Sequence, residues 1–274
     1  MCKVFEVSRS GFYAWLVRGP SKRAIANKQL IYQIKIIHNE SKRTYGSPRI
    51  TAELNSQNYR ASRPRVARLM KQERIYSKVR KRYIGRVDSK QQYCAAPNLL
   101  ERNFVANTPG TKWVSDITYI KVKSNWIYLT TVIDLYDRKV IGWALSSTML
   151  TSETTIPALK MALNNRTVDQ SIVFHSDRGI QYMCTEFTNL LKQEKIKASM
   201  SRKGNCWDNA VAESFFKSIK TECTNHIDFH SFRHAKLVIF KYIEVWYNRK
   251  RRHSYLDYAT PLEMEKLFYK NKAA

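Results

Sequence analysis

Residues 199–222 read SMSRKGNCWDNAVAESFFKSIKTE and change character part of the way along. They open on the end of a strand, pass through the polar turn SRKGN, and are expected to become helical after Asp208. At about 100° per residue, Val211, Phe215 and Ile219 share one face, which predicts a buried stripe. The opposite face carries one carboxylate beside an amide and two cations, namely Asn209, Glu213, Lys217 and Lys220. Such a face is usually a solvated row of salt bridges, so its meaning depends on the acids upstream.

The charge of the chain is strongly unbalanced, with 48 Lys and Arg against 22 Asp and Glu and a formal net charge of +26. A charge this high repels itself and predicts a polyanionic partner, with nucleic acid ahead of an acidic membrane surface. The 274 residues allow two or three domains that each bury a core. No apolar run approaches the length of a membrane span, and we expect no membrane partner.

The cysteines indicate the compartment. There are 5 of them, widely spaced and without a CxxC pair. This pattern speaks against a disulfide framework or a zinc knuckle and indicates a reducing environment. We therefore expect a cytoplasmic protein that binds nucleic acid.

Residues 1–85 predict a helical, helix-turn-helix DNA-binding domain. A short helix is capped by Ser8, and a second helix follows from Asn27 with apolar residues at helical spacing. A third helix has Ser47 as its N-cap and Pro48 in its first position.

The last helix of this domain, RPRVARLMKQE, begins after Ser62 and has one apolar and one basic face. The apolar face predicts burial of Val66, Leu69 and Met70. The outward face is almost wholly basic and consists of Arg63, Arg65, Arg68 and Lys71. A tight turn followed by a basic final helix is typical of the helix-turn-helix, in which the final helix reads DNA. An ordinary three-helix bundle with a basic surface is the alternative.

Residues 86–110 are polar and aperiodic and contain Pro97 and Pro109, which predicts an interdomain linker. They follow the basic run KVRKRYIG at residues 78–85. Tracking of this segment along a phosphate backbone is the alternative to a plain linker.

From Lys112 the pattern changes to strands. The segments KWVSDITYIKV, WIYLTTVIDL and KVIGWALSS are joined by short turns and predict an antiparallel meander. A helix over 151–164 follows, and Pro157 predicts that its regular part starts late. The buried strand IVFHSD, a helix over 185–194 and the strand KASM come next. The order β-β-β-α-β-α-β-α is that of the α/β ribonuclease-H-like fold, a mixed five-stranded sheet with helices on both faces. We expect this core to span residues 111–225.

A C-terminal helical extension with the basic cluster NRKRRH is expected at residues 226–274. It begins with a long amphipathic helix capped by Ser231. The residues expected to face inward are Phe232, Ala235, Ile239, Tyr242 and Trp246. Three histidines at four-residue spacing could indicate a metal on a helix, namely His226, His230 and His234. An N-cap at Ser231 would interrupt that helix and speaks against zinc.

Three acids stand out in the predicted core. Asp116 lies midway along the first strand, Asp177 lies at the carboxyl end of IVFHSD, and Glu213 follows the last strand. Aspartates in apolar strands are costly unless they are paired or bound to cations. Acids without Cys or His ligands suit Mg²⁺ or Mn²⁺. Two such ions bridged by Asp116 would align an attacking oxygen and stabilise the leaving 3′-oxygen of a phosphodiester. For each acid, an ordinary surface charge is the alternative.

Neighbours of these acids are open to two interpretations. By strand alternation His175 shares a face with Asp177, and it either tunes the site or is a hydrogen-bonded structural residue. Asp134 is either a fourth carboxylate or a turn residue at a strand end. Trp207 and Asn209 either shape a DNA-facing loop or pack and cap.

Four long segments are distinctive: WVSDITYI, HSDRGIQY, SMSRKGNCWDNAVAESFFKSIKTE and YNRKRRHSYLDYATPLEM. In this order they resemble the DDE transposases of bacterial insertion sequences, of the OrfB type related to retroviral integrases. TYGSPRI and APNLL match as well, so that the resemblance covers nearly the whole chain.

The resemblance implies that Asp116, Asp177 and Glu213 are the metal-binding triad and that Lys220 contacts transposon-end DNA. Lys217 and Asn209 are further DNA-contact candidates on the same helix. It also implies an enzyme that nicks the element's ends and joins the freed 3′-OH to new DNA, without a covalent protein intermediate or ATP. The implied partners are double-stranded DNA at the element ends and target, further copies of the chain on that DNA, and the product of an upstream reading frame.

Two other functions remain as alternatives at this stage. One is a nuclease of the same fold that hydrolyses DNA without strand transfer. The other is a non-catalytic, N-terminally truncated DNA binder that occupies element ends and represses transposition. The complete triad favours the transposase.

Overall fold

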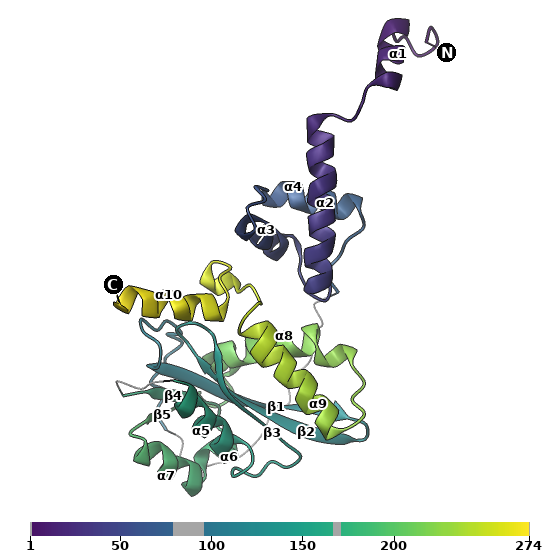
Figure 1. Ribbon diagram of the computed structural model, residues 1–274. Helices are drawn as coiled ribbons and strands as arrows, with labels where there is room; N and C mark the ends of the chain where they lie inside the picture. Colours follow the sequence, from purple (N-terminus) through teal and green to yellow (C-terminus); the bar gives the residue numbers. More distant parts are fainter. Residues whose placement is uncertain (1, 79–95, 167–170, 274) are drawn as a thin grey trace. The chain divides into compact units, whose positions relative to one another are not determined.

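The computed structural model describes residues 2–78, 96–166 and 171–273 (Figure 1). The chain divides into two compact units, Met1–Lys78 and Val79–Ala274. Most of the basic run and the first half of the expected linker, at 79–95, lie outside the described residues.

The first unit is helical, as predicted. Its helices are α1 (Arg9–Val17), α2 (Lys22–Glu40), α3 (Ser47–Ser56) and α4 (Arg63–Gln72). Ser8 caps α1, since its hydroxyl accepts a hydrogen bond from the backbone N–H of Gly11 at 3.0 Å. The expected cap of α3 is wrong by one residue, because Ser47 is already helical and Gly46 holds the N-cap position. The buried residues of α2, α3 and α4 form the core, with Leu30, Ile34, Ile37, Ile50, Leu54, Val66, Leu69 and Met70 at its centre.

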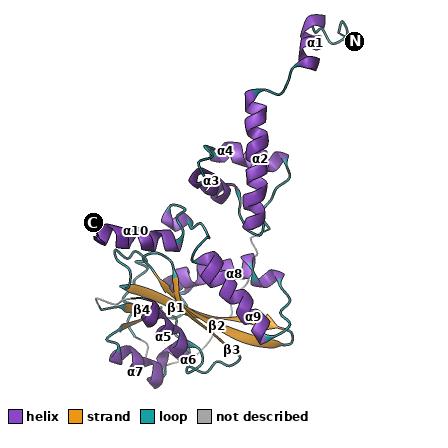
Figure 2. Cartoon of the chain, in the orientation of Figure 1, coloured by secondary structure: helices purple, strands orange, loops and turns teal. Residues whose placement is uncertain are grey.

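The second unit contains a five-stranded mixed sheet in the order β3-β2-β1-β4-β5 (Figure 2). The strands are β1 (Lys112–Val122), β2 (Asn125–Asp134), β3 (Val140–Ser146), β4 (Val173–Ser176) and β5 (Lys197–Met200). The first three form an antiparallel meander, while β4 pairs in parallel with both β1 and β5. This arrangement confirms the mixed sheet predicted from the sequence.

Each face of the sheet is covered by its own set of helices. One face packs on α5 (Thr155–Asn165) and α7 (Thr185–Gln193), and its core includes Trp113, Phe174 and Phe187. The other face packs on α8 (Ala210–Glu222) and α9 (Phe232–Phe240), and its core includes Val114, Phe215 and Ile239. β1 contributes to both cores because successive side chains of a strand point to opposite faces.

One helix starts late, as Pro157 predicts, and a second helix was not predicted. α5 begins at Thr155, late in the predicted range, because Pro157 is tolerated only in a first turn. The short helix α6 (Ile180–Met183) between β4 and α7 was not predicted.

The C-terminal extension begins as predicted, with the Ser231 hydroxyl accepting from the backbone N–H of His234 at 3.1 Å. α9 then widens into a π-helical segment at Lys241–Tyr247. Ala235, Ile239 and Tyr242 are buried as expected, but Phe232 is exposed, which corrects that prediction. The last helix is α10 (Pro261–Ala273). Across the described residues, no helix has both the length and the apolar character needed to span a bilayer.

Gly142 on β3 sets how closely α5 packs on the sheet. A methyl group at this position would collide with the backbone of Ala158 and Ala162. We expect Gly142→Ala to destabilise the second unit by about 1–3 kcal/mol, measured by denaturant unfolding. Gly19→Ala is the control, since nothing lies near its added methyl. Equal stability of the two variants would contradict the prediction.

Candidate active site

The site forms where the pairing of β1 with β4 ends. These strands pair in parallel only from Lys112 to Val114 on β1, so Asp116 lies two residues beyond the last paired position. The Asp116 carboxylate Oδ1 accepts a hydrogen bond from the backbone N–H of Ile117 at 2.8 Å. Asp116 therefore sits on a strand edge that β4 leaves uncovered.

Asp177 follows the last residue of β4 directly, at the carboxyl end of the strand as predicted. Its Oδ1 accepts a hydrogen bond from the backbone N–H of Gly179 at 2.9 Å, which fixes the turn into α6. Burial raises the pKa of this carboxyl, and the hydrogen bond from Gly179 opposes the rise.

Two of the acids act electrostatically on the third, Asp116. Burial raises the pKa of Asp116 well above its ordinary value, and the charges of Asp177 and Glu213 raise it further. The hydrogen bond from Ile117 and the charge of Lys220 lower it. Glu213 is exposed in the first turn of α8. The structure thus brings Asp116, Asp177, Glu213 and Lys220 into one neighbourhood.

Lys220 lies between this neighbourhood and an aromatic ring. Its Nζ is 5.0 Å from the centroid of the Tyr119 ring. Burial lowers the pKa of Lys220, while the charge of Asp116 favours the ammonium form. Lys217, one turn earlier on α8, is exposed.

The side chains of the acids do not form a complete set of metal ligands among the described residues. Within the described ranges, no three His, Cys, Asp or Glu side chains lie close enough to hold a metal ion. The chemistry of the set nevertheless fits a hard cation, because its donors are all carboxylate oxygens and they repel one another without one.

Asn209 is placed differently from the prediction. A 3₁₀ turn at Cys206–Asn209 precedes α8, so that Asn209 does not continue the exposed row with Glu213. It is buried, and its Nδ2 donates a hydrogen bond to the Ser115 carbonyl at 3.0 Å. Asn209 therefore ties the start of α8 to the residue next to Asp116, and its side chain is not available to DNA in this conformation.

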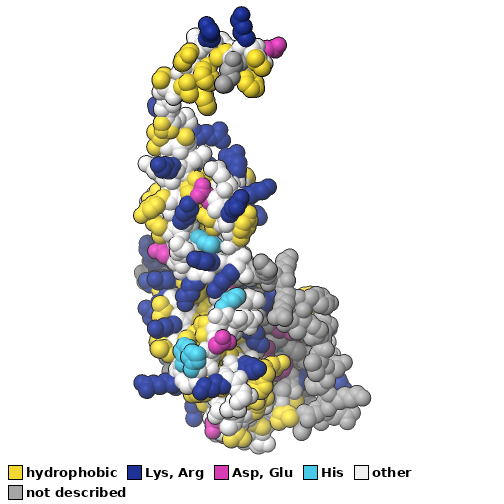
Figure 3. All heavy atoms as spheres, turned by 90° about the vertical axis from the view of Figure 1, so that its right-hand side faces the viewer, with side chains coloured by type: hydrophobic (Ala, Val, Ile, Leu, Met, Phe, Trp, Pro, Cys, Tyr) yellow, Lys and Arg dark blue, Asp and Glu magenta, His cyan; other side chains and the backbone are white. Residues whose placement is uncertain are grey.

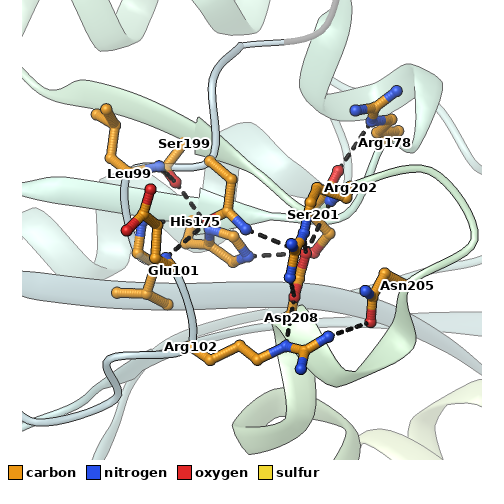
Figure 4. A network of polar contacts seen from close by, with 12 residues as sticks. Leu99, Glu101, Arg102, His175, Arg178, Ser199, Ser201, Arg202, Asn205 and Asp208 are labelled. Carbon is orange, nitrogen blue, oxygen red and sulfur yellow. Dashed lines mark hydrogen bonds and ion pairs between the residues drawn. The ribbon is translucent and has the colours of Figure 1, made fainter.

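Asp208 is the centre of a polar network that the sequence did not reveal (Figure 4). Its buried carboxylate accepts hydrogen bonds from Arg202 Nε and Arg202 Nη2, both at 2.9 Å, and from the Arg202 backbone N–H at 3.0 Å. Arg102 Nε donates at 2.9 Å and Asn98 Nδ2 at 3.0 Å. The Arg202 side chain is the main reason that the pKa of Asp208 lies well below its usual range. The network fixes the loop that leads from β5 into α8.

His175 is a hydrogen-bonded structural residue. It is fully buried, with Nδ1 2.8 Å from the Ser199 hydroxyl and Nε2 3.1 Å from the Ser201 hydroxyl (Figure 4). Burial lowers its pKa to about 4, so the ring is neutral near pH 7.

Asp134 is likewise structural. Its carboxylate accepts from the backbone N–H groups of Gly110 and Tyr136 and lies 3.2 Å from Arg166 Nε. It therefore closes a turn rather than joining the acidic site. The rings of His230 and His234 stack with centroids 5.5 Å apart. Neither ring belongs to a group of three described His, Cys, Asp or Glu side chains that could hold a metal ion.

The basic face of α4 is only partly as predicted. Arg63, Arg68 and Lys71 are exposed. Arg65 is half-buried, because its Nε and Nη2 donate to Asn27 Oδ1 at 3.0 and 2.8 Å. In Figure 3, dark-blue Lys and Arg side chains clearly outnumber the magenta acids on the face shown.

Comparison with known families matches three parts of the chain. Residues 25–83 match an HTH-like domain, and residues 106–206 and 194–261 match two models of an integrase core domain. The chain is 38% identical over 100% of its length to the "Insertion element IS600 uncharacterized 31 kDa protein" of Shigella sonnei, covering 100% of that protein. It is 37% identical to the transposase InsF for insertion sequence IS3A of Escherichia coli K12, over 97% of this chain and 92% of the relative.

Solved structures give weaker likenesses. The HTLV-2 integrase catalytic core domain in complex with magnesium matches with a TM-score of 0.44 and 16% identity, over 58% of this chain and 99% of that chain. The simian T-cell lymphotropic virus intasome matches with a TM-score of 0.47 and 14% identity, over 84% of this chain and 73% of that chain. Scores this low carry no functional inference.

The Asp208 network predicts how the loop before α8 behaves. Asp208→Asn removes the charge that Arg102 and Arg202 share, so we expect a lower melting temperature of the second unit. We also expect faster amide hydrogen exchange over residues 201–213, measured by mass spectrometry. The control is Asp228→Asn, an exposed acid outside the network. Exchange and melting equal to the control would contradict the role of Asp208.

Proposed function

This chain belongs to the family of the InsF transposases of insertion sequence IS3, and on this premise we propose that Asp116, Asp177 and Glu213 form its catalytic centre. Its activity is that of a DNA transposase, a polynucleotidyl transferase with an integrase core behind an HTH-like domain. The family resemblance predicted from the sequence is thereby confirmed.

One observation carries the proposed centre. The charges of Asp177 and Glu213 both raise the pKa of Asp116, and the charge of Lys220 lowers it. The three acids come from a strand middle, a strand end and a helix that are far apart in the sequence. A carboxyl whose pKa is raised by two neighbouring acids is typical of sites that work on a bound cation.

The proposed reaction has two steps at phosphorus. In the first, a water oxygen bonds to phosphorus at the element end, and the P–O3′ bond breaks to free a 3′-OH. In the second, that 3′ oxygen bonds to a target phosphorus, and the target's own P–O3′ bond breaks. The second step exchanges one phosphodiester for another, so it needs neither ATP nor a covalent protein intermediate.

Each acid has a proposed part in holding the cations, Mg²⁺ or Mn²⁺. The partly buried Asp116 and Asp177 would supply most of the negative charge, and Glu213 would complete the set from the first turn of α8. A bound divalent cation, or a pair of them, would supply Lewis acidity at the phosphoryl group. Lys220, which is close to Asp116, would hold a phosphate beside the cation site.

We assign DNA contacts to both units. On α8, Lys217 and Lys220 would contact the end being cut. On α4, the exposed Arg63, Arg68 and Lys71 would bind phosphates or base edges. Arg65 would first have to leave Asn27, so we expect it to contribute less.

We propose end recognition by residues 1–85, catalysis by 111–225 and a supporting extension at 226–274. The described part of the expected linker, residues 96–110, belongs with the catalytic core, because Leu100 is buried in that core and Asn98 and Arg102 bind Asp208. Assembly of several copies on DNA, with or without the product of an upstream reading frame, completes the proposal.

Strand transfer with a labelled element end tests the centre. Asp116→Asn, Asp177→Asn and Glu213→Gln should each lower Mg²⁺-dependent nicking and joining by at least about 10³-fold, because the cation loses a charged ligand. DNA affinity should remain, since no positive charge is lost. Glu186→Gln is the matched control, an exposed Glu in the first turn of α7. Substantial joining by any triad variant would overturn the assignment, and cleavage without joining would indicate a nuclease.

The repulsion among the acids predicts a link between cation and stability. The folded pKa of Asp116 is raised, so at pH 7.5 its ionised form destabilises the fold. Without divalent cations, Asp116→Asn should therefore melt a few degrees higher than the parent. Adding Mg²⁺ should raise the melting temperature of the parent and leave the variant unchanged. Calorimetry in EDTA and in Mg²⁺ measures both, and an equal response of the two proteins would exclude a cation at Asp116.

A further inference from the structure

The hairpin of β1 and β2 presents two large aromatic side chains to solvent. Tyr119 is 59% exposed and Trp126 is 48% exposed. Their rings form an edge-to-face pair with centroids 5.1 Å apart. Exposed aromatic pairs of this kind are a feature of binding surfaces, because a partner that covers the rings removes a large apolar area from water.

The pair lies close to the acidic site. Tyr119 stands three residues beyond Asp116 on the same strand, about 10 Å along it, so the two side chains leave opposite faces of β1 and meet one ligand only at the strand edge that β4 leaves uncovered. Lys220 lies between the Tyr119 ring and the acids. Its Nζ is 5.0 Å from the centroid of the Tyr119 ring, and its charge lowers the pKa of Asp116. A ligand whose backbone passes the acids would therefore meet these rings within about three base-pair steps of 3.4 Å.

The side chains around the aromatic pair are positively charged, which favours a negatively charged ligand. Lys121 lies directly opposite Trp126 in the strand register, and Lys123 follows at the hairpin turn. Both lysines are exposed. No Asp or Glu occurs from Ile117 to Ile133. A second copy of this chain would bring a further net charge of +26 to this basic surface, whereas a polyanion is attracted to it.

We propose that Tyr119 and Trp126 bind one unpaired base of the DNA end, stacked on an aromatic face and within about three nucleotides of the phosphate that reacts. The inference rests on the proposed catalytic centre and adds a site to it. A paired base hides its flat faces inside the duplex, so aromatic rings can stack only on a base that has left the helix. Phosphate contacts from Lys121 and Lys220 would hold the backbone on either side of that base.

Stacking predicts a preference for ends that are already unpaired. The full chain is titrated with the DNA end that it joins, once fully paired and once with mismatches in the three positions next to the reacting phosphate. The parent should bind the mismatched end at least about 10-fold more tightly, because the cost of unpairing is already met. In Trp126→Ala, which leaves Lys220 in place, this preference should fall to near one.

Conservative and matched variants keep the test sharp. Tyr119→Phe should retain the preference because it keeps the ring, while Tyr119→Ala should lose it. Tyr269→Ala is the control, since Tyr269 is a comparably exposed aromatic, at 44%, on α10. A 2-aminopurine base at the mismatched positions should change its fluorescence on binding to the parent and not on binding to Trp126→Ala.

The outcomes separate this inference from the proposed centre. If the parent joins DNA and the triad variants do not, the centre stands. If Trp126→Ala and Tyr119→Ala then match Tyr269→Ala in mismatch preference and fluorescence, the aromatic site is overturned. A change in sedimentation of Trp126→Ala without any change in base preference would likewise overturn it, and would identify the pair as a contact between copies.

Discussion

The parallel pairing of β1 with β4 is the constraint on which the site depends. It covers only the first residues of β1, from Lys112 to Val114, and then ends. Because the strands run in the same direction, the end of β4 delivers Asp177 toward the part of β1 that carries Asp116. The cores on both faces of the sheet hold this arrangement against the repulsion of the two carboxylates. A register error of one residue would turn Asp116 to the opposite face.

The third acid depends on a different set of contacts. α8 starts where Asn209 binds the Ser115 carbonyl and where the Asp208 network holds the preceding loop. Both contacts act directly before the first turn of the helix, and that turn carries Glu213. The buried residues Phe215 and Ile219 then fix the rotation of the helix on the sheet. Polar contacts thus set where the helix begins, and apolar contacts set which way it faces.

Much of this could be predicted, and the reasons are local. Patterns among neighbouring residues predict the strands with period two, the helices with period 3.6 and the position of Asp177 after an apolar strand. The structure confirms all three. Asn209 was misplaced because a 3₁₀ turn shifts it out of the helical row. Two further contacts, Arg102 with Asp208 and Arg65 with Asn27, could not be predicted, because they join residues that are distant in the chain and leave no local sequence pattern.

The distribution of charge explains how such a site is compatible with a strongly basic chain. Positive charge at the surface draws DNA toward the protein from a distance, but it cannot position one phosphate. Positioning needs groups whose places are fixed, and Lys220 has such a place because it is half-buried between Asp116 and Tyr119. Burial lowers the pKa of Lys220 and the charge of Asp116 opposes this shift, while the charge of Lys220 in turn lowers the pKa of Asp116. Binding of a phosphate by Lys220 and of a cation by Asp116 would replace this charge interaction with two others, so that neither charge would be left without an opposite one.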